Sequence, residues 1–154
     1  DVGKIGVDDA ILRKPGKLTD EEFAAIKAHT VIGSQILSRI SSMPELQYGA
    51  LYHHERWDGR GYPKGLKGEE IPEAARIIAV ADAYDAMTSN RSYRKALTQD
   101  CVHDEIVNGI GRQFWPPAAR AMLKMMDQDI HYDMRQKNDE SSQNDEQKYE
   151  YGIS

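Results

Sequence analysis

Apolar residues recur at the three- and four-residue spacing of an α-helix along most of the chain. The first such stretch covers residues 18–40, and its apolar positions are Phe23, Ile26, Ile32, Ile36, Leu37 and Ile40. Thr19 followed by Glu22 matches the capping box that starts many helices. Four further helices are predicted by the same spacing and by proline in a first turn. They run from Pro44 to His54, from Pro72 to Met87, from Asp100 to Asn108, and from just after Pro117 to Met126.

No segment alternates apolar and polar residues for long enough to predict a sheet. The pattern therefore predicts an all-α fold, a helical bundle without internal repeats, and 154 residues fit one domain. Hydrophobic content of 40% and charged content of 29% are typical of globular proteins. No apolar run approaches the roughly 18 residues of a membrane span, and no signal peptide opens the chain. Because the single cysteine, Cys101, also fits a reducing compartment, we expect a cytoplasmic protein.

The net charge of −5 is concentrated at the C-terminal end of the chain. Residues 127–154 hold eight acidic and three basic residues and few apolar ones, which is typical of a solvated, disordered extension. We therefore expect a folded domain at residues 1–126 and a polar tail at 127–154. The domain is neutral, but its basic residues cluster, which favours an anionic ligand over a nucleic-acid surface. The clusters are Arg56, Arg60, Lys64 and Lys67, then Arg91, Arg94 and Lys95.

Four polar residues interrupt the helical pattern. His29 lies in the first long helix, His53 and His54 end the second, and Asp82 interrupts an apolar helix. A single helical histidine is more often a core or surface residue than a ligand, whereas an unpartnered buried carboxylate is costly. Asp82 therefore needs a metal ion, an arginine or several donors. Together the four residues are typical of a carboxylate–imidazole metal site. Helical neighbours differ by about 100°, so the two adjacent rings are expected to point in different directions.

The first residues of the chain add a further carboxylate. Asp1 is followed by Gly3, which lets the backbone approach closely, and by Lys4 one turn later. With "DVGKIGV", the segments "LRKPGKLTDEEF", "HHERWDGRGYP" and "ADAYDAMTSNRSYRKAL" resemble successive motifs of the HD-GYP family of cyclic-dinucleotide phosphodiesterases. That family is a branch of the HD metal-dependent phosphohydrolases. The resemblance covers residues 1–98 almost without gaps and residues 99–126 more loosely.

The resemblance implies a role for each matching residue. Five positions correspond to metal ligands: Asp1, which would bridge two ions, His29, His53, His54 and Asp82. Four correspond to substrate contacts: Lys4, Tyr62, Arg91 and Arg94, the arginines as a pair that grips the phosphates. Asp1 and Lys4 are the implied catalytic residues, Gly61, Tyr62 and Pro63 form the triplet that names the family, and Asp85 would support the site. In a site with several ions, divergent His53 and His54 rings would each bind a different one.

The implied function is metal-dependent hydrolysis of cyclic di-GMP to linear pGpG or GMP in bacterial second-messenger signalling. Two or three divalent transition-metal ions would assist, and mixed carboxylate–imidazole ligation suits iron or manganese. Two alternatives stay open: a degenerate receptor that binds the dinucleotide without cleaving it, and an interaction module that docks a partner such as a diguanylate cyclase domain. The resemblance also implies an upstream sensor or receiver domain, and exposed apolar surface would favour a dimer.

Two positions depart from the family pattern. The histidine that precedes the aspartate in the family is absent before Asp1. We therefore expect a truncated domain that lacks one ligand and the upstream helices, and that turns over substrate poorly. Where the family reads Gly-x-x-Phe-Asp-Pro, this chain reads "GRQFWPP", with Trp115 in place of the aspartate. Tryptophan cannot cap the helix that follows, at a cost of about 1 kcal/mol.

Overall fold

The described part of the chain is helical. The structure is a computed structural model that describes residues 1–90 and 95–135. These ranges contain one isolated bridge, between Ile110 and Phe114, and no strand, so the all-α prediction is confirmed. None of the helices in them has the length and apolarity to cross a bilayer. The elements are the 3₁₀ helix η1 (Val2–Gly6), α1 (Asp9–Leu12), α2 (Asp20–Leu37), α3 (Glu45–Tyr52), the 3₁₀ helix η2 (Gly68–Glu70), α4 (Glu73–Thr88), α5 (Gln99–Gly109) and α6 (Pro116–Gln128).

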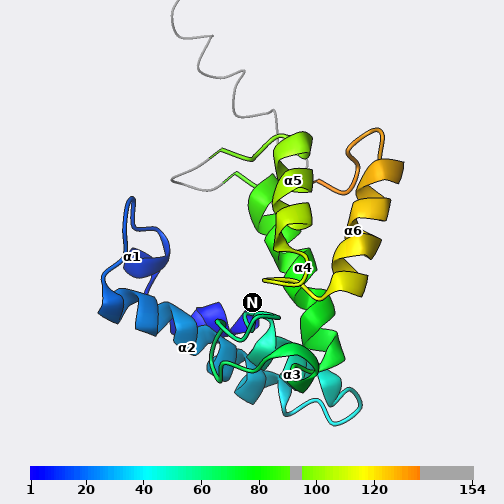
Figure 1. Cartoon of the computed structure of the whole chain (residues 1–154). Helices are drawn as coiled ribbons and strands as arrows, with labels where there is room; N and C mark the ends of the chain where they lie inside the picture. The colour runs from blue at the N-terminus through cyan, green and yellow to red at the C-terminus, as the bar shows by residue number, and fades with distance from the viewer. Residues whose placement is uncertain (91–94, 136–154) are drawn as a thin grey trace, which may run out of the picture.

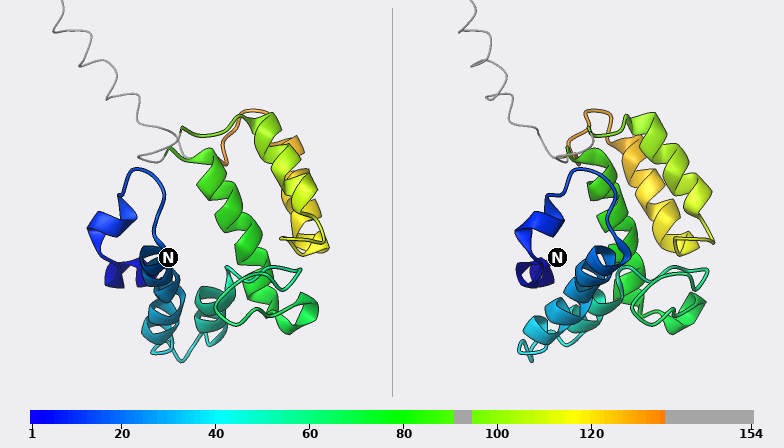
Figure 2. Two further views of the ribbon diagram at one scale, coloured as in Figure 1. Left: turned by 60° about the vertical axis from the view of Figure 1, so that its left-hand side comes forward. Right: turned by 90° about the vertical axis from the view of Figure 1, so that its left-hand side faces the viewer.

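The helices form two groups that meet where α3 contacts α4 (Figure 1). In the first group, α2 packs against η1 and α3; in the second, α4 packs against α5 and α6. Figure 2 shows the same division from two further directions, with η1, α1 and α2 on one side of the molecule and α5 and α6 on the other. The two groups are also joined by the loop after α3, where the Trp57 and Asp58 N–H groups donate to the carbonyl oxygens of Gln113 and Arg112 at 3.1 and 2.7 Å.

The larger hydrophobic core lies in the second group. Buried side chains of α4, α5, α6 and the segment before α6 form it: Val80, Tyr84, Val102, Ile106, Phe114, Ala119 and Met126. Val102 and Ile106 stand one turn apart on α5 and are both fully buried, as the helical spacing requires. This core fixes α4, the helix that carries Asp82.

The packed body continues past the predicted boundary at residue 126. α6 ends at Gln128, and the Asp129 carboxylate then accepts hydrogen bonds from the N–H groups of Asp133 and Met134, at 2.8 and 3.0 Å. The resulting turn packs the half-buried Met134 against the core. Packing against the core therefore extends to Met134, and the division into a domain at residues 1–126 and a polar tail stays a prediction. Residues 136–154 of the predicted tail lie outside the described residues.

Helix starts follow the sequence signals. α2 begins with the predicted capping box: the Thr19 hydroxyl accepts from the Glu22 N–H at 3.2 Å, and the Glu22 carboxylate accepts from the Thr19 N–H at 2.7 Å. α6 follows Trp115 without a side-chain cap, as the departure from the family pattern predicts. The Trp115 ring instead faces the guanidinium group of Arg76, which lies 4.8 Å from the ring centroid.

Candidate metal centre

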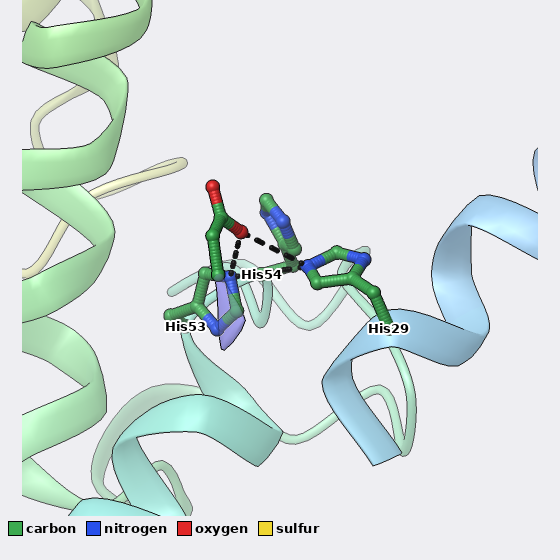
Figure 3. A group of neighbouring side chains, drawn as sticks. His29, His53 and His54 are labelled. Atoms are coloured by element: carbon green, nitrogen blue, oxygen red, sulfur yellow. Dashed lines mark hydrogen bonds and ion pairs between the residues drawn. The ribbon is translucent and has the colours of Figure 1, made fainter. Parts of the chain in front are cut away.

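Four side chains from three segments meet beside the C-terminal end of α3. They are Asp1 before η1, His29 in α2, and His53 and His54 directly after α3. One ring nitrogen or carboxylate oxygen from each lies within 4.8 Å of those of the others. Figure 3 shows the three imidazoles around a common centre. Ligands of one ion with bonds of roughly 2.0–2.2 Å lie about 3–4 Å apart, so a small inward shift suits this group to a divalent ion.

Close packing of η1 on α2 brings Asp1 to the histidines. A Cβ atom on Gly3 would lie 1.9 Å from the His29 carbonyl oxygen and 2.4 Å from the Gly33 nitrogen, so only glycine fits there. The expectation that Gly3 permits a close backbone approach is confirmed. Asp1 directly precedes η1, and its Oδ1 atom lies 3.4 Å from His29 Nε2.

Backbone hydrogen bonds orient two of the rings. His29 Nδ1 donates to the carbonyl oxygen of Ile26 at 2.6 Å, and His53 Nδ1 donates to that of Ala50 at 2.8 Å. Because a carbonyl oxygen can only accept, each Nδ1 carries the hydrogen, and Nε2 of the neutral ring keeps a lone pair. Metal-binding histidines are commonly held by such a bond on the other ring nitrogen. Both rings are also buried, which restricts their motion further.

Three hydrogen-bond acceptors therefore face one another. The Nε2 atoms of His29 and His53 lie 3.4 Å apart, and Asp1 Oδ1 lies 3.4 Å from the first and 3.8 Å from the second. Negative partial charges at these distances repel, so the arrangement needs a cation or a proton between them. A ring proton is disfavoured, because burial lowers the pKa of His29 and of His53. The donor set thus fits a divalent metal ion.

His54 joins the same group rather than facing away from it. Its ring centroid lies 4.1 Å from that of His53, with the ring planes tilted by 40°. The expectation of divergent rings is wrong, although His53 keeps helical backbone dihedrals of φ −65° and ψ −15°. A ring lies beyond Cβ, so the side-chain torsions also decide where it points. Burial lowers the pKa of His54 to about 3, and His53 and His29 add to this effect. His54 is therefore a neutral ring that can serve as a ligand.

The ring of Tyr62 lies against His54. The two centroids are 4.8 Å apart, with planes tilted by 31°. Phe23 of α2 meets the Tyr62 ring edge-on at 6.3 Å, and the Lys27 ammonium lies 4.4 Å from the Phe23 centroid. Burial raises the pKa of Tyr62 to about 12, with a smaller contribution from Asp82. Tyr62 is thus a neutral aromatic wall of the site.

Two cavities meet beside the converging residues. Their volumes are about 580 and 920 Å³, and they share Phe23, His54, Tyr62, Asp82 and Ala86 as lining residues. Asp82 is half-buried and reaches this junction, but it lies outside the four-residue group. Both cavities also hold cationic side chains: Lys27, Arg56 and Arg60 line the first, and Lys4, Lys14 and Lys17 line the second. Arg56 and Lys14 are already ion-paired with Asp58 and Glu22, and the carboxylates of Glu55, Asp82 and Glu105 also line the first cavity. The cations that can meet anionic groups of a ligand are Lys27 and Arg60 in the first cavity and Lys17 in the second.

The remaining predicted residues lie around the group or outside the described ranges. The Lys4 ammonium is ion-paired with the second carboxylate oxygen of Asp1. Asp85 is exposed and accepts a hydrogen bond from the Ser89 hydroxyl at 3.5 Å, and it lines neither cavity. Arg91 and Arg94 lie outside the described residues.

The sequence analysis does not single out Glu55, a buried carboxylate beside the site. Glu55 directly follows His54 and is 3% exposed. Its Oε1 atom accepts hydrogen bonds from the N–H groups of Lys64 and Gly65, at 2.6 and 3.1 Å, and Oε2 accepts from Leu66 at 3.0 Å. One signal points to it: a glycine-rich loop leaves backbone N–H groups that need acceptors, and a carboxylate adjoins that loop.

Fold and site together define a helical protein with a cluster of three histidines and one aspartate that fits a divalent metal ion. The profile of a family described as "HD domain" matches residues 1–114, and the chain belongs to this family. The resemblance to its HD-GYP branch is confirmed by curated relatives. A cyclic di-GMP phosphodiesterase of Thermotoga maritima is 48% identical over 147 residues, which cover 94% of this chain and 40% of the relative. A 3′3′-cGAMP-specific phosphodiesterase 2 of Vibrio cholerae is 40% identical over 132 residues, which cover 84% and 25%.

A solved structure shares the fold. It is titled as a cyclic GMP-AMP-specific phosphodiesterase of Vibrio cholerae, V-cGAP3, and matches with a TM-score of 0.57 at 16% identity. The match covers 84% of this chain and 34% of that one. The chain thus spans 40% or less of the length of these relatives.

Proposed function

We propose that this domain is a metal-dependent phosphodiesterase that hydrolyses cyclic di-GMP or a closely related cyclic dinucleotide. The observation that carries the proposal is that the facing acceptors of Asp1, His29 and His53 lie beside two cavities: His53 lines the first, His29 lines the second, and His54 of the same group lines both. A cyclic dinucleotide has two phosphates, and each cavity offers cations that can pair with one. Relatives named as cyclic di-GMP phosphodiesterases, at 46% to 48% identity, support this substrate class.

The proposed metal ligands are the four converging residues, with Asp82 as a further carboxylate from α4. Two or three ions are proposed, and iron or manganese is the proposed metal because mixed carboxylate–imidazole ligation suits both. Bound ions of this kind polarise a phosphodiester and activate water for hydrolysis. Asp1 would share an ion with His29 and His53, because its Oδ1 atom faces the Nε2 atoms of both rings.

Side chains of the chain itself would bind and orient the substrate. Lys4, which pairs with Asp1 and lines the larger cavity, would turn to a phosphate oxygen once metal offsets the Asp1 charge. Arg91 and Arg94, which follow α4 in the sequence, are assigned to the phosphates as well. Together these cations would offset charge that develops on the phosphoryl oxygens. The Tyr62 ring beside His54 offers a flat surface for a base or ribose.

A hydrolysis assay under metal control tests the proposal. The chain is loaded with Mn²⁺ or Fe²⁺ and incubated with cyclic di-GMP, and the products are separated by chromatography. We expect linear pGpG or GMP to form slowly. His53→Ala should lower the rate of hydrolysis by more than the roughly 10–100-fold that is typical of a residue outside the metal ligands. His103→Ala is the matched control, since this histidine of α5 is 41% exposed and lies outside the site. Tight binding without product would favour the receptor alternative, and neither binding nor product would contradict the proposal.

A further inference from the structure

We infer that Glu55 is a positioning residue for the metal centre, because it clamps the loop of residues 61–66 so that the Tyr62 ring holds His54 in place. The inference rests on the metal centre of the proposed function. Glu55 itself is assigned no contact with metal or substrate. It acts through the loop on one proposed ligand.

His54 is held differently from the other two histidines. The rings of His29 and His53 are each fixed by a hydrogen bond from Nδ1 to a backbone carbonyl oxygen. Among the described residues, the His54 ring has no hydrogen-bond partner, and its ring–ring contacts are with His29, His53 and Tyr62. Two of those three rings belong to the metal group itself. Tyr62 is therefore the ring from outside the group that fixes His54.

The loop that carries Tyr62 folds back onto the histidine segment. The Tyr62 N–H donates to the His54 carbonyl oxygen at 3.2 Å. A Cβ atom on Gly61 would lie 2.4 Å from the Arg56 nitrogen and 2.5 Å from Glu55 Cα, so the two backbones are in direct contact. This contact sets the backbone of Tyr62 relative to His54, and thereby brings the two rings together.

Glu55 fixes the far side of the same loop. Its two carboxylate oxygens accept N–H groups from three successive residues, 64 to 66. Hydrogen bonds to an ionised acceptor are roughly twice as strong as neutral ones. At 3% exposure Glu55 has little access to water. Loss of these bonds would therefore leave both the carboxylate and the backbone N–H groups unpaired, which costs free energy for each. Since Glu55 adjoins His54 in the chain, the clamp ties the loop directly to the ligand.

Cobalt binding tests this inference without an activity measurement. The chain and its Glu55→Gln variant are titrated with Co²⁺, whose visible absorption responds to ligand geometry. Glutamine keeps the size of the side chain but replaces one acceptor oxygen by an NH₂ donor facing backbone N–H groups. We expect Co²⁺ affinity to fall by about 10–100-fold, with a changed absorption spectrum. Glu70→Gln is the matched control: this exposed carboxylate accepts the Lys67 N–H at 2.9 Å beyond the clamped residues, and Co²⁺ affinity should not change.

A second background separates positioning from general loss of stability. If Glu55 acts through His54, Glu55→Gln lowers Co²⁺ affinity in the wild-type chain and has no further effect in a His54→Ala chain. A carboxylate needed only for loop folding would lower the melting temperature and leave Co²⁺ affinity unchanged. That result, or an equal loss of affinity in both backgrounds, would overturn the inference.

Tyr62 variants keep the inference testable if Glu55→Gln does not fold. Tyr62→Phe retains the ring and should bind Co²⁺ as the wild type does, whereas Tyr62→Leu removes it and should bind about 10-fold more weakly. Equal affinities of the two variants would contradict the inference. A wild-type chain that binds no Co²⁺ would refute the metal centre and the inference with it. Normal binding by every variant would refute the inference alone.

Discussion

His29 and His53 each donate a hydrogen bond from Nδ1 to a backbone carbonyl oxygen. In the neutral ring the Nε2 atom is then an acceptor with a free lone pair. Two lone pairs and one Asp1 oxygen then lie within 3.8 Å of one another. At the scale of single residues, the three facing acceptors therefore suit a cation that all of them can bind. Burial makes a proton unfavourable in this place, because the pKa of both rings is lowered.

Single cations that bind substrate should be separable from the residues that bind metal. A charge-assisted hydrogen bond to phosphate contributes about 1.5–3 kcal/mol. Arg91→Ala and Arg94→Ala are each expected to raise the dissociation constant for cyclic di-GMP by about 10- to 100-fold. Metal content should stay the same in both variants, because neither side chain is a plausible ligand. Calorimetric titration and elemental analysis measure the two quantities.

Arg13→Ala is the control for this pair, since its side chain is 81% exposed and lines neither cavity. It should leave the dissociation constant unchanged. Normal binding of cyclic di-GMP by both Arg91→Ala and Arg94→Ala would show that the phosphates are held elsewhere, with the cavity cations Lys27, Arg60 and Lys17 as the next candidates.

At the scale of elements, the site depends on how closely short segments approach the long helix α2. Gly3 and Gly33 allow η1 to lie on α2 with backbone in contact. His53 and His54 follow α3 directly and join the same group. The four candidate ligands thus come from three segments, and no single helix carries the site.

Gly3→Ala should disturb the site through this packing. The added Cβ would meet the His29 carbonyl oxygen, which belongs to helix backbone and cannot move aside cheaply. We expect a loss of about 1–3 kcal/mol in the free energy of unfolding, and weaker metal binding because Asp1 is displaced. Chemical denaturation and Mn²⁺ titration measure both effects. Ile5→Ala is the control, because its side chain lies in the same 3₁₀ helix and is 84% exposed; an Ile5→Ala loss as large as that of Gly3→Ala would argue against the packing account.

The long helices could be predicted because their signals are local. Helical spacing and the capping box at Thr19 lie within the segment that they describe, and α2 starts where they place it. The short elements η1, α1 and η2 carry too few residues for a period to be visible. The positions of His54 and Glu55 depend on the end of α3 and on contacts with residues about ten positions away. Such contacts leave no periodic trace in the sequence.

At the scale of the whole molecule, one helical group contains the main hydrophobic core and the other contains the four converging residues. The group of α4, α5 and α6 contains the larger hydrophobic core and presents Asp82. The group of η1, α2 and α3 supplies the four converging residues. Both cavities are lined by residues of α2 and of α4, so the substrate site of the proposed function lies between the groups. Sequence patterns predicted the long helices and singled out His29, His53, His54 and Asp82, and the family resemblance added Asp1; their roles as ligands stay predictions. The patterns could not show that Asp82 lies outside the group that the other four form.

The central claim is that Asp1, His29, His53 and His54 form a divalent-metal site. Equilibrium dialysis against Mn²⁺, followed by elemental analysis, tests it most directly on the wild-type chain, His53→Ala and the exposed-histidine control His103→Ala. The account predicts at least one bound ion per chain for the wild type and for His103→Ala, with His53→Ala losing most of it. A wild-type chain without bound ion, or a His53→Ala chain that binds as much as the wild type, would contradict it.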